Sequence, residues 1–370
     1  GQGGVHHVWG VDHFKSTLNA EEFRRTYRRR TNLVKEAMDS VPYGDRAAQL
    51  EQIVAAIKRG GLFSVVVDIL PTQIGEAAHV WLPAATAGEM NLTSMNGERR
   101  LRLSERYMDP PGAALPDCLI AARLGNALEE SFRRAGSDAD AARFKGKFDW
   151  TTEEDAFMDG YHAHAEGGEH VTYERLRAMG TNGVHEPVVA VADGRLVGTR
   201  RLYTDGRFGT ADGRARFLET AWRGLQVAGR QEQKDRHPFL INNGRNNLVW
   251  QNAFYDVHTP FVRERMPVAP IEMNPADMAR LGLAAGDLVE VYNDVGSTQA
   301  MAYPTPTAKP GQAFMLFIAP TGQVGNVISK GTNELMIPNY KNVWADIRRI
   351  GRAPGADAMS FKSIEYPHGA

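Results

Sequence analysis

An apolar run over Leu62–Val67 constrains the fold more than any other feature, because only Ser64 interrupts it and Asp68 closes it. A strand that is apolar on successive residues buries both of its faces, as strands at the centre of a parallel sheet do. The pair Gly60-Gly61 before the run predicts the end of a helix over about residues 47–58. The run therefore predicts a parallel sheet that helices cover.

Further strands and helices alternate around this run. Residues 5–9 are a strand candidate that ends in a turn at Gly10-Val11-Asp12, and residues 79–82 are another strand candidate. Asn19, with Glu22 three positions later, predicts a capping box at the start of an amphipathic helix. A further helix is expected over residues 119–132. This β-α-β pattern predicts a doubly wound α/β sheet over residues 1–135.

The middle of the chain, residues 136–236, predicts a connector rather than an independent domain. Thr151 with Glu154 can cap a short helix there. Asp-Gly turns at Asp193, Asp205 and Asp212 stand between short alternating runs, which is typical of hairpins.

The last stretch, residues 237–370, is rich in strand signals. Strands are expected over residues 239–241, 287–292 and 313–318. The one clear helix is Pro275–Leu281, with Asn274 as its N-cap and proline at its first position. A strand-rich unit with a single helix predicts a closed or partly closed β-barrel.

Composition excludes several classes of function. Lysine and arginine (43) nearly balance aspartate and glutamate (44), so nothing favours nucleic acid or an anionic membrane surface. No apolar run reaches the length of a membrane-spanning helix. The single cysteine, Cys118, cannot form an internal disulfide, a structural zinc site or an iron–sulfur cluster, and we expect it to be a core thiol on a buried helix.

Candidate binding residues stand where the predicted parallel strands end. Ligands of open α/β sheets bind outside the carboxyl ends of the strands, where Asp12 and Asp68 could accept hydrogen bonds from a ribose or a guanine. The alternative is that these aspartates cap turns. The donor-rich segment Gly88–Arg100 predicts either a functional loop or a solvated one.

Two further polar segments are candidates in the strand-rich stretch. Asn242-Asn243-Gly244-Arg245-Asn246-Asn247 follows a predicted buried strand, and the rigid donor fork of Arg245 suits phosphate or a pterin edge. Lys341, in Tyr340-Lys341-Asn342, could contact an anionic ligand, although a surface lysine is the alternative. His162, His164 and His170 have a spacing that could hold a metal, but their glycine-rich surroundings favour a flexible loop.

Taken in order, these motifs resemble the molybdopterin oxidoreductases of the dimethyl sulfoxide reductase superfamily, and within it the large subunits of arsenite oxidases. Three stretches carry the resemblance: Gly88–Arg100; Asn242–Asn247 with Trp250 and Gln251; and Ile271–Pro275 continuing to Val291–Ser297. The resemblance is loosest over residues 136–202. Because the chain opens at Gly1 and lacks the cysteine motif of that family, we expect it to be a C-terminal part of such a subunit.

The resemblance implies a fold and a cofactor. Residues 1–135 would be an incomplete Rossmann-like guanosine-binding domain, and residues 237–370 a double-psi β-barrel that binds the molybdopterin dinucleotide. The cofactor would be molybdenum held by two molybdopterin guanine dinucleotides. The family's [3Fe–4S] cluster is expected only outside this chain.

The resemblance also implies residue roles by position, with no catalytic residue or metal ligand in this chain. The guanosine would be bound by Asp12, Ser16 and Asp68, with Glu98 nearby. The pterin and dithiolene face would be lined by Arg245, Trp250 and Gln251. Further cofactor contacts would come from Asn293 and Lys341. His79 stands where many members of the superfamily have an aspartate, so the contact of that aspartate is not carried over.

The resemblance implies arsenite as the substrate, oxidised to arsenate by oxo transfer, with a Rieske iron–sulfur small subunit as the partner, in the periplasm. Two alternatives remain open from the sequence. One is a relative with another substrate, such as formate or nitrate. The other is a redox-inactive module that binds a nucleotide or a pterin.

Overall fold

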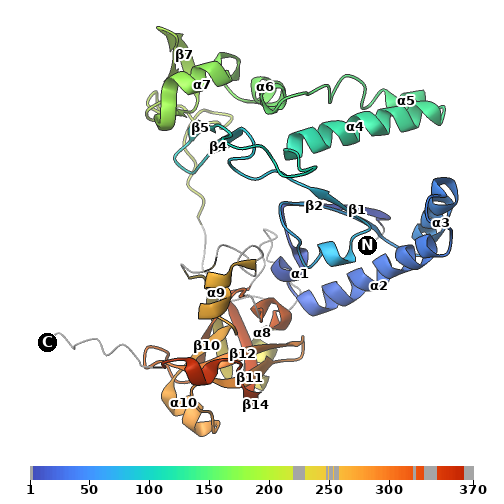
Figure 1. The fold of residues 1–370 in the computed structure, drawn as a ribbon. Helices are drawn as coiled ribbons and strands as arrows, with labels where there is room; N and C mark the ends of the chain where they lie inside the picture. The colour runs from blue at the N-terminus through green and yellow to red at the C-terminus, as the bar shows by residue number, and fades with distance from the viewer. Residues whose placement is uncertain are drawn as a thin grey trace. The chain divides into compact units, whose positions relative to one another are not determined.

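The computed structural model describes residues 3–219, 230–246, 249, 253, 258–319, 322–328 and 340–361. The chain divides into two compact units (Figure 1). The first comprises residues 1–66, 70–81 and 222–370, and the second residues 67–69 and 82–221. No helix of the described residues is long and apolar enough to cross a membrane.

The predicted sheet is present, with three strands in the order β1-β2-β3: Val5–Trp9, Phe63–Asp68 and Val80–Pro83. Five of the six residues of β2 are buried, which confirms the prediction of a strand covered on both faces. Hydrogen bonds from His79 N to Ser64 O (2.9 Å) and from Ala84 N to Asp68 O (3.1 Å) advance together along β2 and β3. Such an advance is the mark of a parallel pair.

Helices α1 (His13–Ser16), α2 (Ala20–Asp39) and α3 (Arg46–Lys58) connect β1 to β2, and the short helix η1 (Gly75–Ala77) connects β2 to β3. Val8, Phe14, Tyr27, Val66 and Ile74 form one buried cluster between the sheet and these helices. The doubly wound arrangement itself stays a prediction.

The predicted capping box at Asn19 is wrong. Asn19 lies in the left-handed region (φ 48°), so its side chain caps no backbone amide of α2. The Asn19 amide instead donates to the Glu22 carboxylate at 2.5 Å, and the Asn19 backbone N–H donates to Ile328 O at 3.1 Å. A long-range backbone bond thus overrides the local capping signal.

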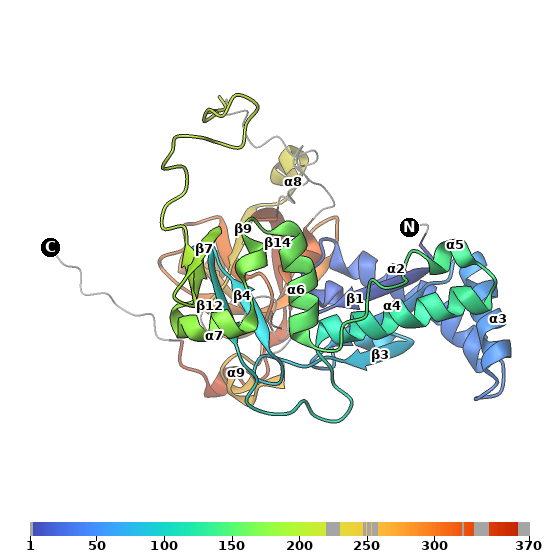
Figure 2. The ribbon, with the colours of Figure 1, turned by 90° about the horizontal axis from the view of Figure 1, so that it is seen from above.

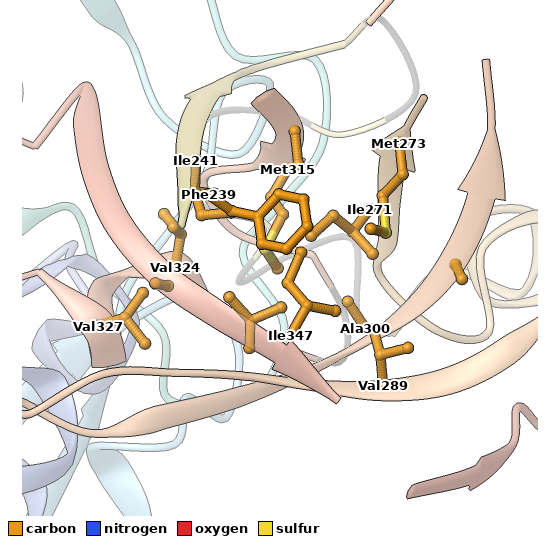
Figure 3. Packing of buried hydrophobic residues seen from close by; sticks show 14 of the residues in the cluster. Phe239, Ile241, Ile271, Met273, Val289, Ala300, Met315, Val324, Val327 and Ile347 are labelled. Carbon is orange, nitrogen blue, oxygen red and sulfur yellow. The ribbon is translucent and has the colours of Figure 1, made fainter. Parts of the chain in front are cut away.

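The strand-rich stretch forms a closed barrel of six strands in the order β10-β12-β11-β14-β9-β13. The strands are β9 (Phe239–Gly244), β10 (Pro270–Met273), β11 (Asp287–Tyr292), β12 (Ser297–Pro304), β13 (Gln312–Leu316) and β14 (Asn342–Arg352). Phe239, Ile271, Val289, Met315 and Ile347 point into its interior, where they are buried (Figure 3). The predicted barrel is confirmed, and its double-psi connectivity stays a prediction.

Short helices cover or close the barrel: α8 (Arg230–Arg236), α9 (Pro260–Arg265), α10 (Pro275–Arg280), η5 (Val324–Val327) and η6 (Ala356–Ala358). The helix expected after Asn274 is confirmed, because the Asn274 side chain accepts from Ala276 N and proline opens α10. The expectation of a single helix is wrong, since it overlooked the proline that opens α9 in the same way.

Helix η5 of the barrel is bound to the loop between β1 and α2. The buried Gln323 side chain donates to Phe14 O at 3.1 Å, and Arg24 donates to the Asn326 side chain at 2.9 Å. A Cβ added to Gly325 would lie 2.9 Å from Thr17 O, so glycine is needed for this close approach. The loop after β1 and the barrel therefore form one packed unit.

The second unit contains two small sheets, β4-β5-β6 and β7-β8. The strands are β4 (Leu92–Met95), β5 (Arg100–Ser104), β6 (Val184–His185), β7 (Val188–Ala192) and β8 (Arg195–Gly198). The helices are α4 (Asp117–Arg134), α5 (Asp138–Ala141), α6 (Glu153–His164), η2 (Gly168–His170), α7 (Tyr173–Met179) and η3 (Gly180–Asn182). Figure 2 shows α7 beside the β7 hairpin, and Leu176 and Leu196 share a buried cluster there.

Several local predictions for this unit need correction. Gly88–Arg100 is not a loop throughout, because Leu92–Met95 pairs antiparallel with Arg100–Ser104. The cap of α6 is Thr152 with Asp155, one residue later than predicted. Within the described part of the chain, the Asp-Gly turn at Asp193 joins two paired strands, whereas those at Asp205 and Asp212 do not. Cys118 is half-buried rather than a core thiol, because it lies on the partly exposed face of α4.

Candidate cofactor-binding site

Two predicted motifs come together at one end of the barrel. Strand β9 ends at Gly244, which is paired with Leu316 at the end of the parallel strand β13. Strand β14 begins at Asn342, which is paired with Asn242. The polar segment after β9 and the Tyr340-Lys341 segment before β14 therefore meet at the same end, which we call the barrel mouth (residues 242–246, 316–317 and 340–342).

Asn243 and Lys341 link the two segments of the barrel mouth. The Asn243 side-chain amide donates to the Tyr340 carbonyl. The Lys341 ammonium donates to the Asn243 carbonyl at 3.3 Å and lies 5.0 Å from the centre of the Tyr340 ring. Tyr340 in turn contacts Phe317, with 5.3 Å between the ring centres. The mouth thus combines a buried amide, two aromatic rings and a lysine.

Arg245 adds a second positive charge to this end of the barrel. It follows β9 directly and is exposed, as is Lys341. Among the residues that the structure describes, no carboxylate pairs with either side chain. A guanidinium and an ammonium that lie at the same end of a barrel can both bind a phosphate-bearing ligand. Trp250 and Gln251, predicted for the same site, lie outside the described residues.

Asn293 has a structural position in the barrel. Its amide donates to Val327 O at 2.7 Å and to Trp344 O at 3.0 Å, and its Oδ1 accepts from Val295 N at 2.9 Å. These bonds join the β11–β12 turn to η5 and β14 within the barrel itself. A cofactor contact by Asn293 stays a prediction.

Asp12 is fully buried, and its carboxylate is engaged by backbone amides. One oxygen accepts from Phe14 N at 2.9 Å and caps α1, while the other accepts from Gln73 N at 2.8 Å. Burial raises the pKa of this carboxyl, and the two hydrogen bonds oppose the rise. The structure therefore realises the turn-capping alternative, and a guanosine contact by Asp12 stays a prediction.

The other predicted guanosine residues lie in different surroundings. Ser16 ends α1 and is partly exposed, with its backbone N–H bonded to Asp12 O at 3.0 Å. Asp68 ends β2, is 1% exposed, and accepts from Ile69 N at 2.8 Å. Ser16 belongs to the first unit, whereas Asp68 and Glu98 belong to the second.

Glu98 lies in the turn between β4 and β5. Its carboxylate accepts from Asn96 at 2.8 Å and pairs with Arg102 at 3.1 Å and with Arg100 at 3.6 Å. The Asn96 hydrogen bond, followed by the two arginines, lowers the pKa of the Glu98 carboxyl. Within the described residues, Glu98 thus stabilises its own hairpin, and a role towards guanosine stays a prediction.

The histidines singled out by sequence have structural contacts. His79 Nδ1 accepts from Ser64 N at 2.9 Å, so its Nε2–H donates to Thr31 O at 3.0 Å. His162 and His164 lie on α6 and not in a loop, because Thr152 and Asp155 cap a full helix there. No group of three or more potential ligands that could hold a metal occurs among the described residues.

Sequence reasoning missed two buried residues near these sites. Lys15 is 3% exposed beside Asp12, and its charge acts to lower the pKa of that carboxyl. Asn243 is 3% exposed and lies in the polar segment that the sequence singled out, but only Arg245 of that segment was assigned a cofactor contact. The alternation along β9 could have found Asn243, because residues 239, 241 and 243 face inward together.

A pterin dinucleotide fits the chemistry of the barrel mouth. Such a group carries phosphates, which Arg245 and Lys341 can bind, and flat rings, which can pack against Tyr340 and Phe317. Two family models match the chain. Residues 43–127 match the model described as Molybdopterin oxidoreductase, and residues 239–344 match the Molydopterin dinucleotide binding domain. The chain belongs to the molybdopterin oxidoreductases of the dimethyl sulfoxide reductase superfamily.

Within this family, the chain is 46% identical over 363 residues to arsenite oxidase subunit AioA of Herminiimonas arsenicoxydans. The match covers 95% of this chain and 44% of that relative. Iodate reductase subunit IdrA of Denitromonas iodatirespirans is 32% identical, with 68% of this chain and 30% of the relative covered. The chain thus spans less than half the length of these relatives.

A solved structure, acetylene hydratase from Pelobacter acetylenicus, superposes with a TM-score of 0.51 at 15% identity. It covers 81% of this chain and 42% of that chain. At this identity the likeness concerns the fold alone.

Proposed function

We propose that this chain is part of the catalytic subunit of an arsenite oxidase, in which it binds a molybdenum cofactor made of two molybdopterin guanine dinucleotides. The observation that carries the proposal is the 46% identity to AioA over 95% of the chain. The barrel mouth supports the cofactor-binding part of the proposal, because two basic side chains and two aromatic rings gather on the domain that matches a dinucleotide-binding family.

In this proposal the barrel mouth holds and orients the cofactor. Arg245 and Lys341 bind phosphate or ring oxygens, and Trp250 and Gln251 complete the pterin face. Asp68 and Ser16 serve guanosine, with Asp12 holding the loop around Ser16 in place through Phe14 N and Gln73 N. Arg24 and Gln323 keep that loop fixed to the barrel.

When bound, the molybdenum group supplies the chemistry by which arsenite gains an oxygen atom and releases two electrons. A [3Fe–4S] cluster outside these residues and a Rieske iron–sulfur small subunit would accept those electrons. The enzyme would lie in the periplasm, as the family resemblance implies. These finer assignments rest on that resemblance.

The test is to express the complete gene product and to measure arsenite-dependent reduction of an artificial electron acceptor, together with its molybdenum content. Arsenite turnover with bound molybdenum supports the proposal in full. Bound molybdenum without arsenite turnover would support the binding of the cofactor but contradict arsenite as the substrate.

A second substrate is worth including in that assay. The IdrA relative is an iodate reductase subunit, so iodate reduction by the same preparation tests the nearest alternative among the relatives described above. Turnover of iodate and not of arsenite would move the chain to that branch of the family.

A further inference from the structure

The side chain of Asn243 has an unusual position at the barrel mouth. It lies on the inward face of β9, in line with Phe239 and Ile241, and is 3% exposed. Its amide nitrogen donates to the Tyr340 carbonyl. Turning the amide over would place its oxygen against that carbonyl oxygen, so this contact fixes which atom faces which way.

The Oδ1 atom of Asn243 has no hydrogen-bond partner among the residues that the structure describes. A buried acceptor without a donor costs about 1–3 kcal/mol, so such atoms are few in stable proteins. Another asparagine of the barrel, Asn293 in the β11–β12 turn, shows the ordinary case, because both of its amide atoms are bonded within the protein. The Asn243 oxygen therefore stands out as an acceptor that a ligand can satisfy.

The chemistry of the atom restricts the ligand group. A carbonyl oxygen accepts hydrogen bonds and cannot bind a phosphate oxygen, so the group must be an N–H or O–H donor. The Lys341 ammonium, which donates to the Asn243 backbone carbonyl at 3.3 Å, is a group nearby that can bind an anion. A ligand that carries both phosphate and ring N–H groups fits this pair of contacts.

We propose that Oδ1 of Asn243 accepts a hydrogen bond from the 2-amino-4-oxopyrimidine edge of the cofactor, the ring edge that pterin and guanine share. This inference rests on the proposed function, and it adds a recognition role for a residue beside Arg245. Asn243 fixes the orientation of the ring, while Lys341 and Arg245 bind its charged groups.

The experiment compares Asn243→Leu with Asn274→Leu in the complete gene product. Asn274 is a matched control in the same barrel, because its amide also donates to a backbone carbonyl, Ala308 O at 2.8 Å. Its Oδ1, however, is satisfied by Ala276 N at 2.9 Å. The readouts are cofactor retention after dilution, measured as molybdenum and guanine nucleotide per chain, and the melting temperature with and without cofactor.

Asn243→Leu is expected to retain the cofactor about tenfold more weakly, as expected for loss of one hydrogen bond to a ligand. Its melting temperature should fall more in the loaded form than in the empty form. Asn274→Leu should lower both melting temperatures equally and leave retention unchanged. Equal retention by Asn243→Leu and the unsubstituted protein would overturn the inference, whereas absence of molybdenum from the unsubstituted protein would overturn the proposed function.

Titration of the empty protein with GMP and, separately, with neopterin distinguishes the two rings. Weakening of only the GMP complex by Asn243→Leu assigns the contact to guanine, and weakening of only the neopterin complex assigns it to pterin. If neither complex is weakened and retention is also unchanged, Asn243 has no recognition role.

Discussion

The Lys341 ammonium lies 3.3 Å from the carbonyl oxygen of Asn243, across the junction between the start of β14 and the end of β9. The two residues are 98 positions apart in the chain. Their contact joins the two polar segments of the barrel mouth, and within the described residues it leaves further N–H groups of the Lys341 ammonium for a ligand.

Replacing Lys341 with glutamine should weaken cofactor retention severalfold, because one positive charge near the phosphates is lost. The loss should shrink as salt is raised, since screening reduces the contribution of a partly exposed charge. The measurement is guanine nucleotide retained per chain at low and high ionic strength. Lys309→Gln, at an exposed lysine of the same barrel, is the control, and an equal effect there would exclude a specific role for Lys341.

Replacing Asp12 with asparagine should lower the free energy of unfolding by about 1–3 kcal/mol. The new amide nitrogen would face either Phe14 N–H or Gln73 N–H, so one buried donor would lose its acceptor. Denaturant unfolding measures the change. The control is Asp39→Asn at the exposed end of α2, and an equal stability loss there would contradict the account of Asp12.

Alanine at position 325 should disrupt the attachment of η5 to the loop before α2. The added Cβ would lie 2.9 Å from the Thr17 carbonyl oxygen, and a crowded backbone contact of this kind costs about 1–3 kcal/mol. Gly351→Ala on β14 has no atom within 4 Å of the added Cβ and should be tolerated. Thermal unfolding compares the two, and equal melting temperatures would show that η5 can move without cost.

Because of His79, the free energy of unfolding should fall as the pH is lowered into the weakly acidic range. Burial lowers the pKa of its imidazole in the folded protein, so the unfolded chain takes up a proton first as the pH falls. The stability is thus fully present above the ordinary histidine value of about 6.5 and is lost progressively as the pH falls below it. Burial lowers the pKa of His6 and His13 as well, so they contribute to the same slope.

The measurement is the free energy of unfolding against pH for the unsubstituted protein and for His79→Gln. The variant should be less stable at neutral pH, because Ser64 N–H and Thr31 O lose their partner, and its slope below pH ~6.5 should be shallower. His164→Gln, at an exposed position of α6, controls for removal of a histidine. An unchanged slope in His79→Gln would contradict the account.

Local patterns predicted the elements whose signals lie within a few residues. Strands β1 and β11 have the predicted bounds, and α10 begins at the predicted asparagine and proline. The hairpin of β4 and β5 was missed because its polar turn resembles a loop. Its strands are defined by the pairing of Leu92–Met95 with residues on the other side of that turn.

Long-range contacts set the features that sequence did not predict. Asn243 is buried because β9 pairs with β13 and β14, whose residues are distant in sequence. Asn19 leaves its expected capping role because Ile328 supplies a partner from the barrel. The resemblance pointed to two residues of the barrel mouth, Arg245 and Lys341, but it assigned no role to the buried side-chain amide of Asn243.

The central claim is that the barrel mouth binds a molybdopterin guanine dinucleotide. The most direct test is to measure molybdenum and acid-released guanine nucleotide in the purified complete gene product and in its Arg245→Ala, Lys341→Gln double variant. The account predicts two guanine nucleotides for each molybdenum in the unsubstituted protein and loss of both from the double variant. Full retention by the double variant, or no guanine nucleotide in either protein, would contradict it.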